Sequence, residues 1–268
     1  MYSVFKPKSE ILQQYISEFT ILNKNNFKPT RYLALPHSKA AISLFNKSSV
    51  IYNEHQLDIT NDKSNSPSVY ILGKYTSPIL LDYKGAVDEI AINFKTLGIN
   101  YFFEDNFDKI ASKPVQILTD NGWNEFSTQL YNIEEDKRID SLENFLLLQI
   151  KHKKLTQIES IIKTMESDKS LKIKDIASEL NISVRTINRL FHRYIGFAPK
   201  DFKRIIRFRS ALKMNVGEIS LTELCLNNDY YDSPHFTNEF RLLTNKNPRD
   251  FFNSMSEIGD EKFPYVFL

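Results

Sequence analysis

The chain has 268 residues, of which 41% are hydrophobic and 13% aromatic, a composition typical of one or two folded domains rather than of a disordered tail. Its single cysteine, Cys225, excludes an internal disulfide and any metal site built from several cysteines. No apolar run is long enough to span a bilayer, and the first residues contain no apolar export signal. We therefore expect a protein of the cytoplasm without a membrane partner.

Short β-branched and aromatic runs alternate with turn clusters up to about Leu118, a pattern typical of strands. The predicted strands are Arg31–Leu35, Ala40–Phe45, Val50–Tyr52, Val69–Leu72, Ile79–Tyr83 and Ile90–Phe94, with a surface loop at Asn61–Pro67. Before the strands, apolar residues at helical spacing predict a helix over Lys8–Phe19, capped by Ser9.

Two more helices are expected after the strands, at Asn124–Tyr131 and Ser141–His152. The basic segment Lys151–Lys154 then separates this half from a second one, in which only helix and turn patterns occur from Thr156 onward. We therefore predict an α+β protein of two domains, a strand-rich domain over residues 1–152 and an all-α domain over residues 153–268.

The helices predicted for the second domain are separated by short turns. They are a supporting helix around Ile158–Met165, a pair at Ile173–Leu180 and Val184–Tyr194, a connector at Phe202–Asn215, a second pair at Leu221–Asn228 and Pro234–Leu243, and a last helix from Pro248 through Phe252. We call the second member of each pair the first and the second reading helix.

The two helix pairs are copies of one layout. In the first copy the markers are Ala177, Asn181, Ile187, Phe191, Gly196, Pro199 and Phe202, and in the second they are Cys225, Asp229, Phe236, Phe240, Asn245, Pro248 and Phe251. From Ile187 and Phe236 onward, matched markers lie 49 positions apart. An internal repeat of this kind predicts two similar structural units in tandem.

Each marker has a mechanical reason for its position in a helix-turn-helix motif. A small residue such as Ala177 lets the two helices approach closely. The turn residue four positions later takes a positive φ, which Asn and Asp tolerate better than other residues with side chains. Ser183 is placed to cap the first reading helix, whose apolar stripe faces inward. Its opposite face carries arginines and Asn188, which hydrogen-bond to base edges and phosphates in a major groove.

Positive charge gathers around the first helix pair although the net charge of the chain is only +2. Residues 182–213 contain nine Lys and Arg residues and one acidic residue, so nine minus one gives +8. Such a patch is typical of a phosphate-binding surface. The candidate DNA contacts are Ser183, Arg185, Thr186, Asn188, Arg189 and Arg193 at the first reading helix, Arg204 and Arg207 on the connector, and Ser233, His235, Thr237, Asn238 and Arg241 at the second reading helix.

At about residues 154–254 the chain resembles the AraC/XylS family of bacterial transcription regulators. The resemblance rests on IASELNIS and INRLFHRYIGFAPKDF in the first copy and on LCLNNDYYDSPHFTNEFRLLTNKNPRDFF in the second. It implies a sequence-specific regulator that reads two successive major grooves of a promoter. Asp229 and Asn245 stand where glycine is common in the family, and Cys225 stands where alanine is common.

The first half resembles a sensor half found in one branch of that family, on the stretches FKPKSEILQQYI, RYLALPHSKAAISLFN, LGKYTSP and INFKTLGINYFF. The likeness implies a cupin-like module that senses an effector, either a small molecule or a protein, or forms a homodimer, and RNA polymerase is a further partner to consider. Apolar residues of this half line an effector pocket or belong to the core, and the sequence leaves both readings open. They are Phe27, Tyr32, Leu33, Phe45, Tyr70 and Tyr75.

Two rival classes of protein have weaker support. For an enzyme with an appended DNA-binding domain, Cys225 lies in an apolar helix pattern, the histidines show no metal-ligand spacing, and no glycine-rich loop could hold a nucleotide. We accordingly predict no catalytic residue, metal or cofactor. A non-specific architectural DNA-binding protein usually spreads its positive charge widely, whereas this chain concentrates it in one half.

Overall fold

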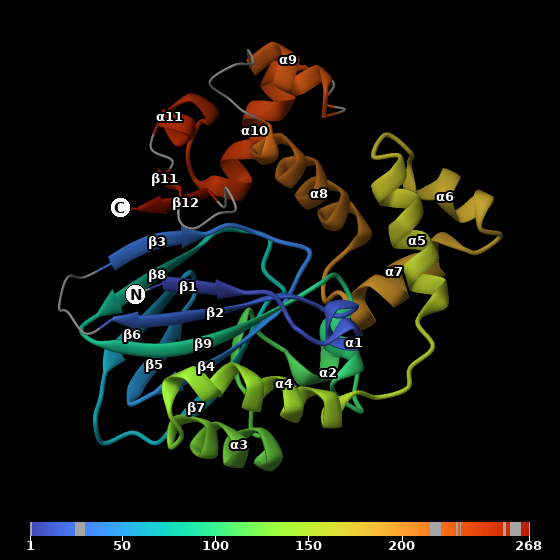
Figure 1. Ribbon diagram of the computed structural model, residues 1–268. Helices are drawn as coiled ribbons and strands as arrows, with labels where there is room; N and C mark the ends of the chain where they lie inside the picture. The colour runs from blue at the N-terminus through green and yellow to red at the C-terminus, as the bar shows by residue number, and fades with distance from the viewer. Residues whose placement is uncertain are drawn as a thin grey trace. The chain divides into compact units, whose positions relative to one another are not determined.

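The computed structural model describes residues 2–24, 30–214, 221–228, 230, 232–253, 256–257 and 264–267 (Figure 1). They fall into two compact units. Unit 1 comprises residues 1–31, 39–74 and 80–153, and unit 2 comprises residues 32–38, 75–79 and 154–268. The predicted domains, 1–152 and 153–268, differ from these units chiefly by the two short segments that join the helical half.

Unit 1 contains a six-stranded antiparallel sheet. Its strands, in spatial order, are β1 (Tyr2–Phe5), β2 (Ile16–Lys24), β9 (Val87–Phe94), β4 (Ala41–Asn46), β7 (Ser68–Leu72) and β10 (Val115–Ile117). In a second sheet of this unit, β8 (Ile79–Lys84), β6 (Gln56–Asn61) and β5 (Ser48–Asn53) are neighbours in that order, and β6 and β8 are parallel. The strand β3 spans Thr30–Ala34. All six predicted strands are confirmed, whereas β1, β2, β6 and β10 were not predicted.

The helix predicted over Lys8–Phe19 is wrong beyond its first turn. Ser9 caps α1 as expected, but α1 spans only Glu10–Gln13, and the chain enters β2 at Ile16. The register of β2 against β9 shifts between Ile16 and Glu18. Because a bulge of this kind inserts one extra residue, Ile16 and Phe19 are both buried in the same core although they are three positions apart. A strand bulge thus imitates helical spacing.

Two helices cover one face of the antiparallel sheet (Figure 1). The helix α3 (Asn121–Tyr131) is capped by Asp120, whose side chain accepts from the Trp123 amide, and α4 (Arg138–Gln149) follows the 3-10 turn η2 (Glu135–Lys137). Short helices η1 (Gly98–Tyr101) and α2 (Phe107–Ile110) precede them. Both helices predicted in this region are confirmed, each beginning three residues earlier than expected.

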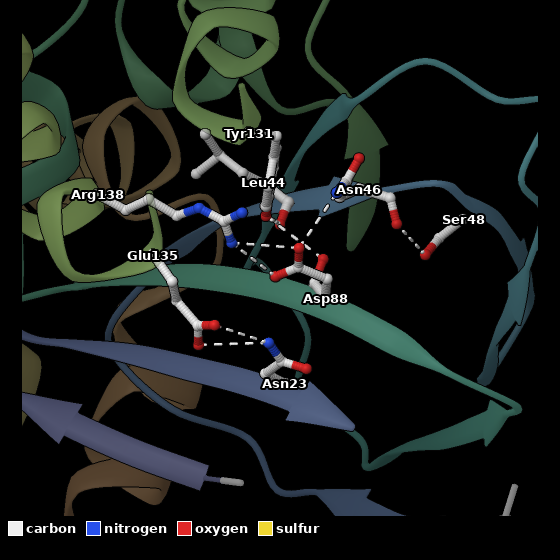
Figure 2. A network of polar contacts seen from close by, with 8 residues as sticks. All are labelled: Asn23, Leu44, Asn46, Ser48, Asp88, Tyr131, Glu135 and Arg138. Atoms are coloured by element: carbon white, nitrogen blue, oxygen red, sulfur yellow. Dashed lines mark hydrogen bonds and ion pairs between the residues drawn. The ribbon is translucent and has the colours of Figure 1, made fainter. Parts of the chain in front are cut away.

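A polar network fixes these helices on the sheet (Figure 2). Arg138, which is buried, donates from Nη1 to both carboxylate oxygens of Asp88 at 3.2 Å, and its guanidinium lies over the Tyr131 ring. The Tyr131 hydroxyl donates to the Leu44 carbonyl at 2.6 Å, and Asn46 donates to Asp88. Four elements, α3, α4, β4 and β9, are therefore joined by this network, and the hydrogen bonds to the Asp88 carboxylate are charge-assisted.

Glu89 of β9 is a second polar group inside unit 1. It is buried and accepts a hydrogen bond from the Tyr83 hydroxyl at 2.8 Å. Loss of hydration on burial raises the pKa of the Glu89 carboxyl above its ordinary value, and hydrogen bonds from Ser43 and Tyr83 offset only part of this effect.

Unit 2 is built mainly from seven described helices. They are α5 (Thr156–Ser167), α6 (Ile173–Glu179), α7 (Val184–Tyr194), α8 (Pro199–Lys213), α9 (Leu221–Leu226), α10 (Ser233–Thr244) and α11 (Pro248–Asn253). The expectation of helix and turn alone after Thr156 is wrong at the end of the chain, where β11 (Ser256–Glu257) and β12 (Pro264–Phe267) pair. Within the same unit, Val266 and Phe267 of β12 pair with Leu33 and Tyr32 of β3, so the backbone of these residues is satisfied by a strand partner.

Candidate nucleic-acid interface

The first helix-turn-helix motif, α6 and α7, has the predicted turn. Ala177 is buried, and Asn181 has a φ of 51°, in the left-handed region expected for it. The amide of Ile182 donates to the Ala177 carbonyl at 2.9 Å, which closes the turn. Ser183 caps α7, because its hydroxyl accepts from the Thr186 amide at 3.0 Å. Both assignments, the turn at Asn181 and the cap at Ser183, are confirmed.

The second motif, α9 and α10, repeats the first in its core. The rings of Phe240 and Phe251 are 5.1 Å apart at 81°, and those of Phe191 and Phe202 are 5.2 Å apart at 75°. Both pairs are edge-to-face contacts, and each residue of the first pair lies 49 positions before its counterpart in the second pair. The repeat of residue types is therefore a repeat of structure.

The ends of α10 show one expected feature and one that was missed. Asn245 has a φ of 56°, which confirms the left-handed turn predicted there, whereas Asp229 lies outside the described residues. The cap of α10 is Asp232, whose carboxylate accepts from the His235 amide at 2.7 Å. Asp232 precedes Ser233 and Pro234, and an acid before a proline at the first turn is a signal that could have predicted this cap.

The outward face of α7 is basic. Arg185, Arg189 and Arg193 are exposed, and Arg193 also lies over the ring of the neighbouring Tyr194. The half-buried Asn188 donates to the Val184 carbonyl of its own helix at 2.9 Å. Two further candidates bond to each other, since the hydroxyls of Ser183 and Thr186 are 2.9 Å apart. The three arginines are thus the candidates best placed to reach a ligand.

The outward face of α10 is almost neutral. Ser233, His235, Asn238 and Arg241 are exposed, and Thr237 is half-buried. Within α10 the single Arg and the single acidic residue, Glu239, give one minus one, or zero, whereas α7 carries three Arg and no acidic residue. The two motifs therefore have the same fold, but the first reading helix is basic and the second has no net charge.

The connector helix α8 does not leave all its cations free. Arg204 donates to Asp201 of the same helix at 2.8 Å. Arg207, a candidate DNA contact, donates to both carboxylate oxygens of Glu239 on α10, at 2.8 and 3.0 Å. Arg209 donates to the carbonyls of Leu35 at 2.6 Å and Pro36 at 2.9 Å, which belong to the same unit. The local charge of +8 therefore overstates the charge that is available to DNA, because charge counting ignores internal pairing.

Three features bear on the rival interpretations of the chain as an enzyme or a membrane protein. Cys225 is buried, and this burial raises the pKa of its thiol, which keeps it protonated and poorly nucleophilic. In the part of the chain that the structure describes, no three His, Cys, Asp or Glu side chains gather to hold a metal. None of the described helices combines the length and the apolar character needed to cross a bilayer.

Among the residues considered for an effector pocket, Phe45 and Tyr70 pack against each other with ring centroids 5.9 Å apart. Tyr75 donates to the Leu35 carbonyl at 3.4 Å, Leu33 is buried, and Phe27 lies outside the described residues. Phe45 and Leu33 are core residues by burial.

Comparison with known proteins finds a family match for part of the helical half. Residues 176–254 match a family described as a helix-turn-helix domain. None of the curated proteins matches the chain. Among solved structures, ToxT from Vibrio cholerae is 12% identical over 88% of this chain and 97% of its own, with a TM-score of 0.49. A fatty-acid-bound ToxT from strain SCE256 is 13% identical over 91% and 97%, also at 0.49. An AraC-type regulator from Chromobacterium violaceum is 26% identical over 35% of this chain and 87% of its own, with a TM-score of 0.32.

The tandem motif, its repeated core and the family match agree. Residues 176–254 are therefore a helix-turn-helix domain, a kind of domain that places a recognition helix in the major groove of DNA.

Proposed function

We propose that α7 and α10 enter two successive major grooves on one face of the duplex, roughly 34 Å apart. The observation that carries this proposal is the matched aromatic pair under each reading helix, Phe191 with Phe202 and Phe240 with Phe251. Because the same aromatic contact supports both helices, each helix should have the same orientation within its own motif. A repeated DNA site, one segment per helix, fits this repeat.

The two helices contribute differently. Arg185 and Arg189 of α7 carry base recognition and most of the attraction to phosphates, with Arg193 toward the end of the same face. His235, Asn238 and Arg241 of α10 make neutral and weakly basic contacts in the second groove. Arg204 remains a candidate for a phosphate contact, since its partner Asp201 lies on its own helix and can release it.

Selection of duplexes from a random pool by the full chain, followed by hydroxyl-radical footprinting, tests the proposal. We expect a defined sequence with two protected segments one helical turn apart. Protection of one segment alone would contradict the two-helix arrangement. Equal affinity for selected and random duplex at one fixed salt concentration would favour the rival class, a non-specific architectural protein.

Unit 1 is proposed to be the input half of a cytoplasmic regulator that has no catalytic step. A small-molecule or protein effector, a second copy of the chain and RNA polymerase are the partners to test. A compound that binds the folded chain raises its melting temperature by mass action. We expect at least one such compound to change the affinity for the selected duplex as well. Sedimentation of the full chain with and without that duplex measures the homodimer.

A further inference from the structure

Arg207 and Glu239 form the ion pair that joins the connector to the second reading helix. Nη2 of Arg207 donates to both carboxylate oxygens of Glu239, at 2.8 and 3.0 Å. The two side chains are 16% and 14% exposed, so water screens the pair only partly. The residues are 32 positions apart and lie on α8 and α10. This pair therefore links two helices and differs from Arg204 with Asp201, which lies within one helix.

Aromatic side chains also contact this ion pair. The Arg207 guanidinium lies over the ring of Tyr230, 5.1 Å from its centroid, and Tyr230 is buried. Tyr230 in turn meets Phe236 of α10 edge to face at 4.9 Å. A planar cation between a carboxylate and an aromatic face has little rotational freedom. Arg207 is therefore fixed in its orientation as well as paired.

His235 adds a third group to Glu239. Its Nε2 lies 3.5 Å from a Glu239 oxygen, one turn earlier on α10, and its side chain is 43% exposed. Glu239 is thus contacted by the mostly buried Arg207 and by the more exposed His235. Glu239 is also the acidic residue of a reading helix that has no net charge.

We propose that Arg207 and Glu239 form a latch that positions α10 for the second groove, so that Arg207 is a positioning residue and not a phosphate contact. The inference rests on the proposed function of α10. An unpaired Glu239 on a reading helix would repel the phosphates, and a helix without net charge gains little from general attraction to DNA. The latch neutralises that acid and at the same time ties α10 to α8.

A phosphate-contact role and a latch role for Arg207 predict opposite effects of Glu239→Gln on DNA binding. If Arg207 contacted a phosphate, Glu239 would compete with DNA for it, and Glu239→Gln would strengthen binding. In the latch, Glu239→Gln removes the ionic partner of a partly buried arginine and loosens α10. We therefore expect the concentration needed to protect the second segment to rise roughly tenfold, with protection of the first segment unchanged.

The test uses the full chain, the duplex it selects from a random pool, and four variants. Glu239→Gln and Arg207→Gln break the latch, and the exchange Arg207→Glu with Glu239→Arg restores a pair of opposite polarity. Glu179→Gln, at an exposed acid on α6, is the charge-matched control. We expect each latch variant to weaken the second segment, the exchange to recover it, and the control to leave the ratio between segments unchanged. Equal or stronger protection of the second segment by Glu239→Gln would overturn the proposal.

Hydrogen exchange of the DNA-free protein tests whether the latch holds α10, independently of DNA binding. We expect faster exchange across α10 in Glu239→Gln, with α7 unchanged, because the latch holds only the second reading helix. Unchanged exchange in α10 would refute the latch whatever the footprint shows. If the wild-type chain fails to protect two segments although exchange responds as expected, the proposed function fails while the latch stands.

Discussion

The turn after α10 offers a direct measure of backbone strain. Asn245 is exposed and has a φ of 56°, and its amide donates to the Arg241 carbonyl at 2.8 Å. A β-branched residue is a strong outlier in this left-handed region, so Asn245→Val should destabilise the second motif by about 1 to 3 kcal/mol. Asn245→Gly exchanges the strain of a side chain for greater entropy of the unfolded chain, and should change stability by less than about 1 kcal/mol.

Two other asparagines supply matched comparisons. Asn181 has a φ of 51° in the first motif, so Asn181→Val should show a similar loss there. Asn132 ends α3 with a φ of −92°, outside the left-handed region, so Asn132→Val should destabilise the chain less than either of the other two Val variants. The comparison separates the φ effect from the general effect of replacing an asparagine by a valine.

Thermal unfolding of the full chain measures the losses, and hydrogen exchange locates them. Each kcal/mol should lower the melting temperature of the affected unit by about 2 to 8 °C. Faster exchange is expected in α10 and α11 for Asn245→Val and in α6 and α7 for Asn181→Val. If both Val variants melted and exchanged like the wild type, the positive φ would impose no strain and the reasoning would be refuted.

Three further predictions concern side chains. Arg189→Ala should relax base preference at one position of the selected sequence by about 1 to 3 kcal/mol, whereas Arg204→Ala should weaken all sequences alike and flatten the salt slope by about 0.9, as measured by titration at several salt concentrations. Arg138→Met should destabilise unit 1 by about 1 to 3 kcal/mol in urea unfolding, because Asp88 loses two charge-assisted hydrogen bonds. Burial raises the pKa of Glu89 in the folded chain, so its carboxyl ionises more easily in the unfolded chain. The stability of the chain should therefore fall as the pH rises above the ordinary pKa of a glutamate. Glu89→Gln should remove this fall in urea midpoints measured from about pH 4 to pH 8.

Local pattern was sufficient wherever one periodicity dominates. The first reading helix was predicted as Val184–Tyr194 and has those bounds, because its apolar stripe, its Ser183 cap and its polar outer face all agree. The turns at Asn181 and Asn245 followed from the repeat, since each copy supports the interpretation of the other. Where a bulge interrupts a strand, as at Ile16, periodicity gives the wrong element because the extra residue changes which side chains share a face.

The partners of charged residues could not be predicted in the same way. Arg207 and Glu239 are far apart in sequence, and only the packing of α8 on α10 brings them together. A local count of charge treats every exposed-looking arginine as available, although Arg207 and Arg209 are engaged within unit 2. The signal that was overlooked is Glu239 itself. An acidic residue on a helix expected to face phosphates needs a cation nearby, and Arg207 on the connector was a candidate.

In the proposed complex, the same geometry would let two helices of unequal charge bind one DNA site. The first reading helix has three exposed arginines, so it can bind phosphates without the second helix. The second has no net charge and gains little from general attraction to phosphates, but in the proposed complex α8 would fix where α10 falls on the duplex once the first helix is bound. The second helix would then bind DNA in an intramolecular step, and its contribution to the affinity would depend on how rigidly α10 is held. The latch between Arg207 and Glu239 is the described ion pair between α8 and α10 that can supply such rigidity. Salt dependence should therefore belong mainly to the first motif, and the required spacing between the two DNA segments mainly to the second.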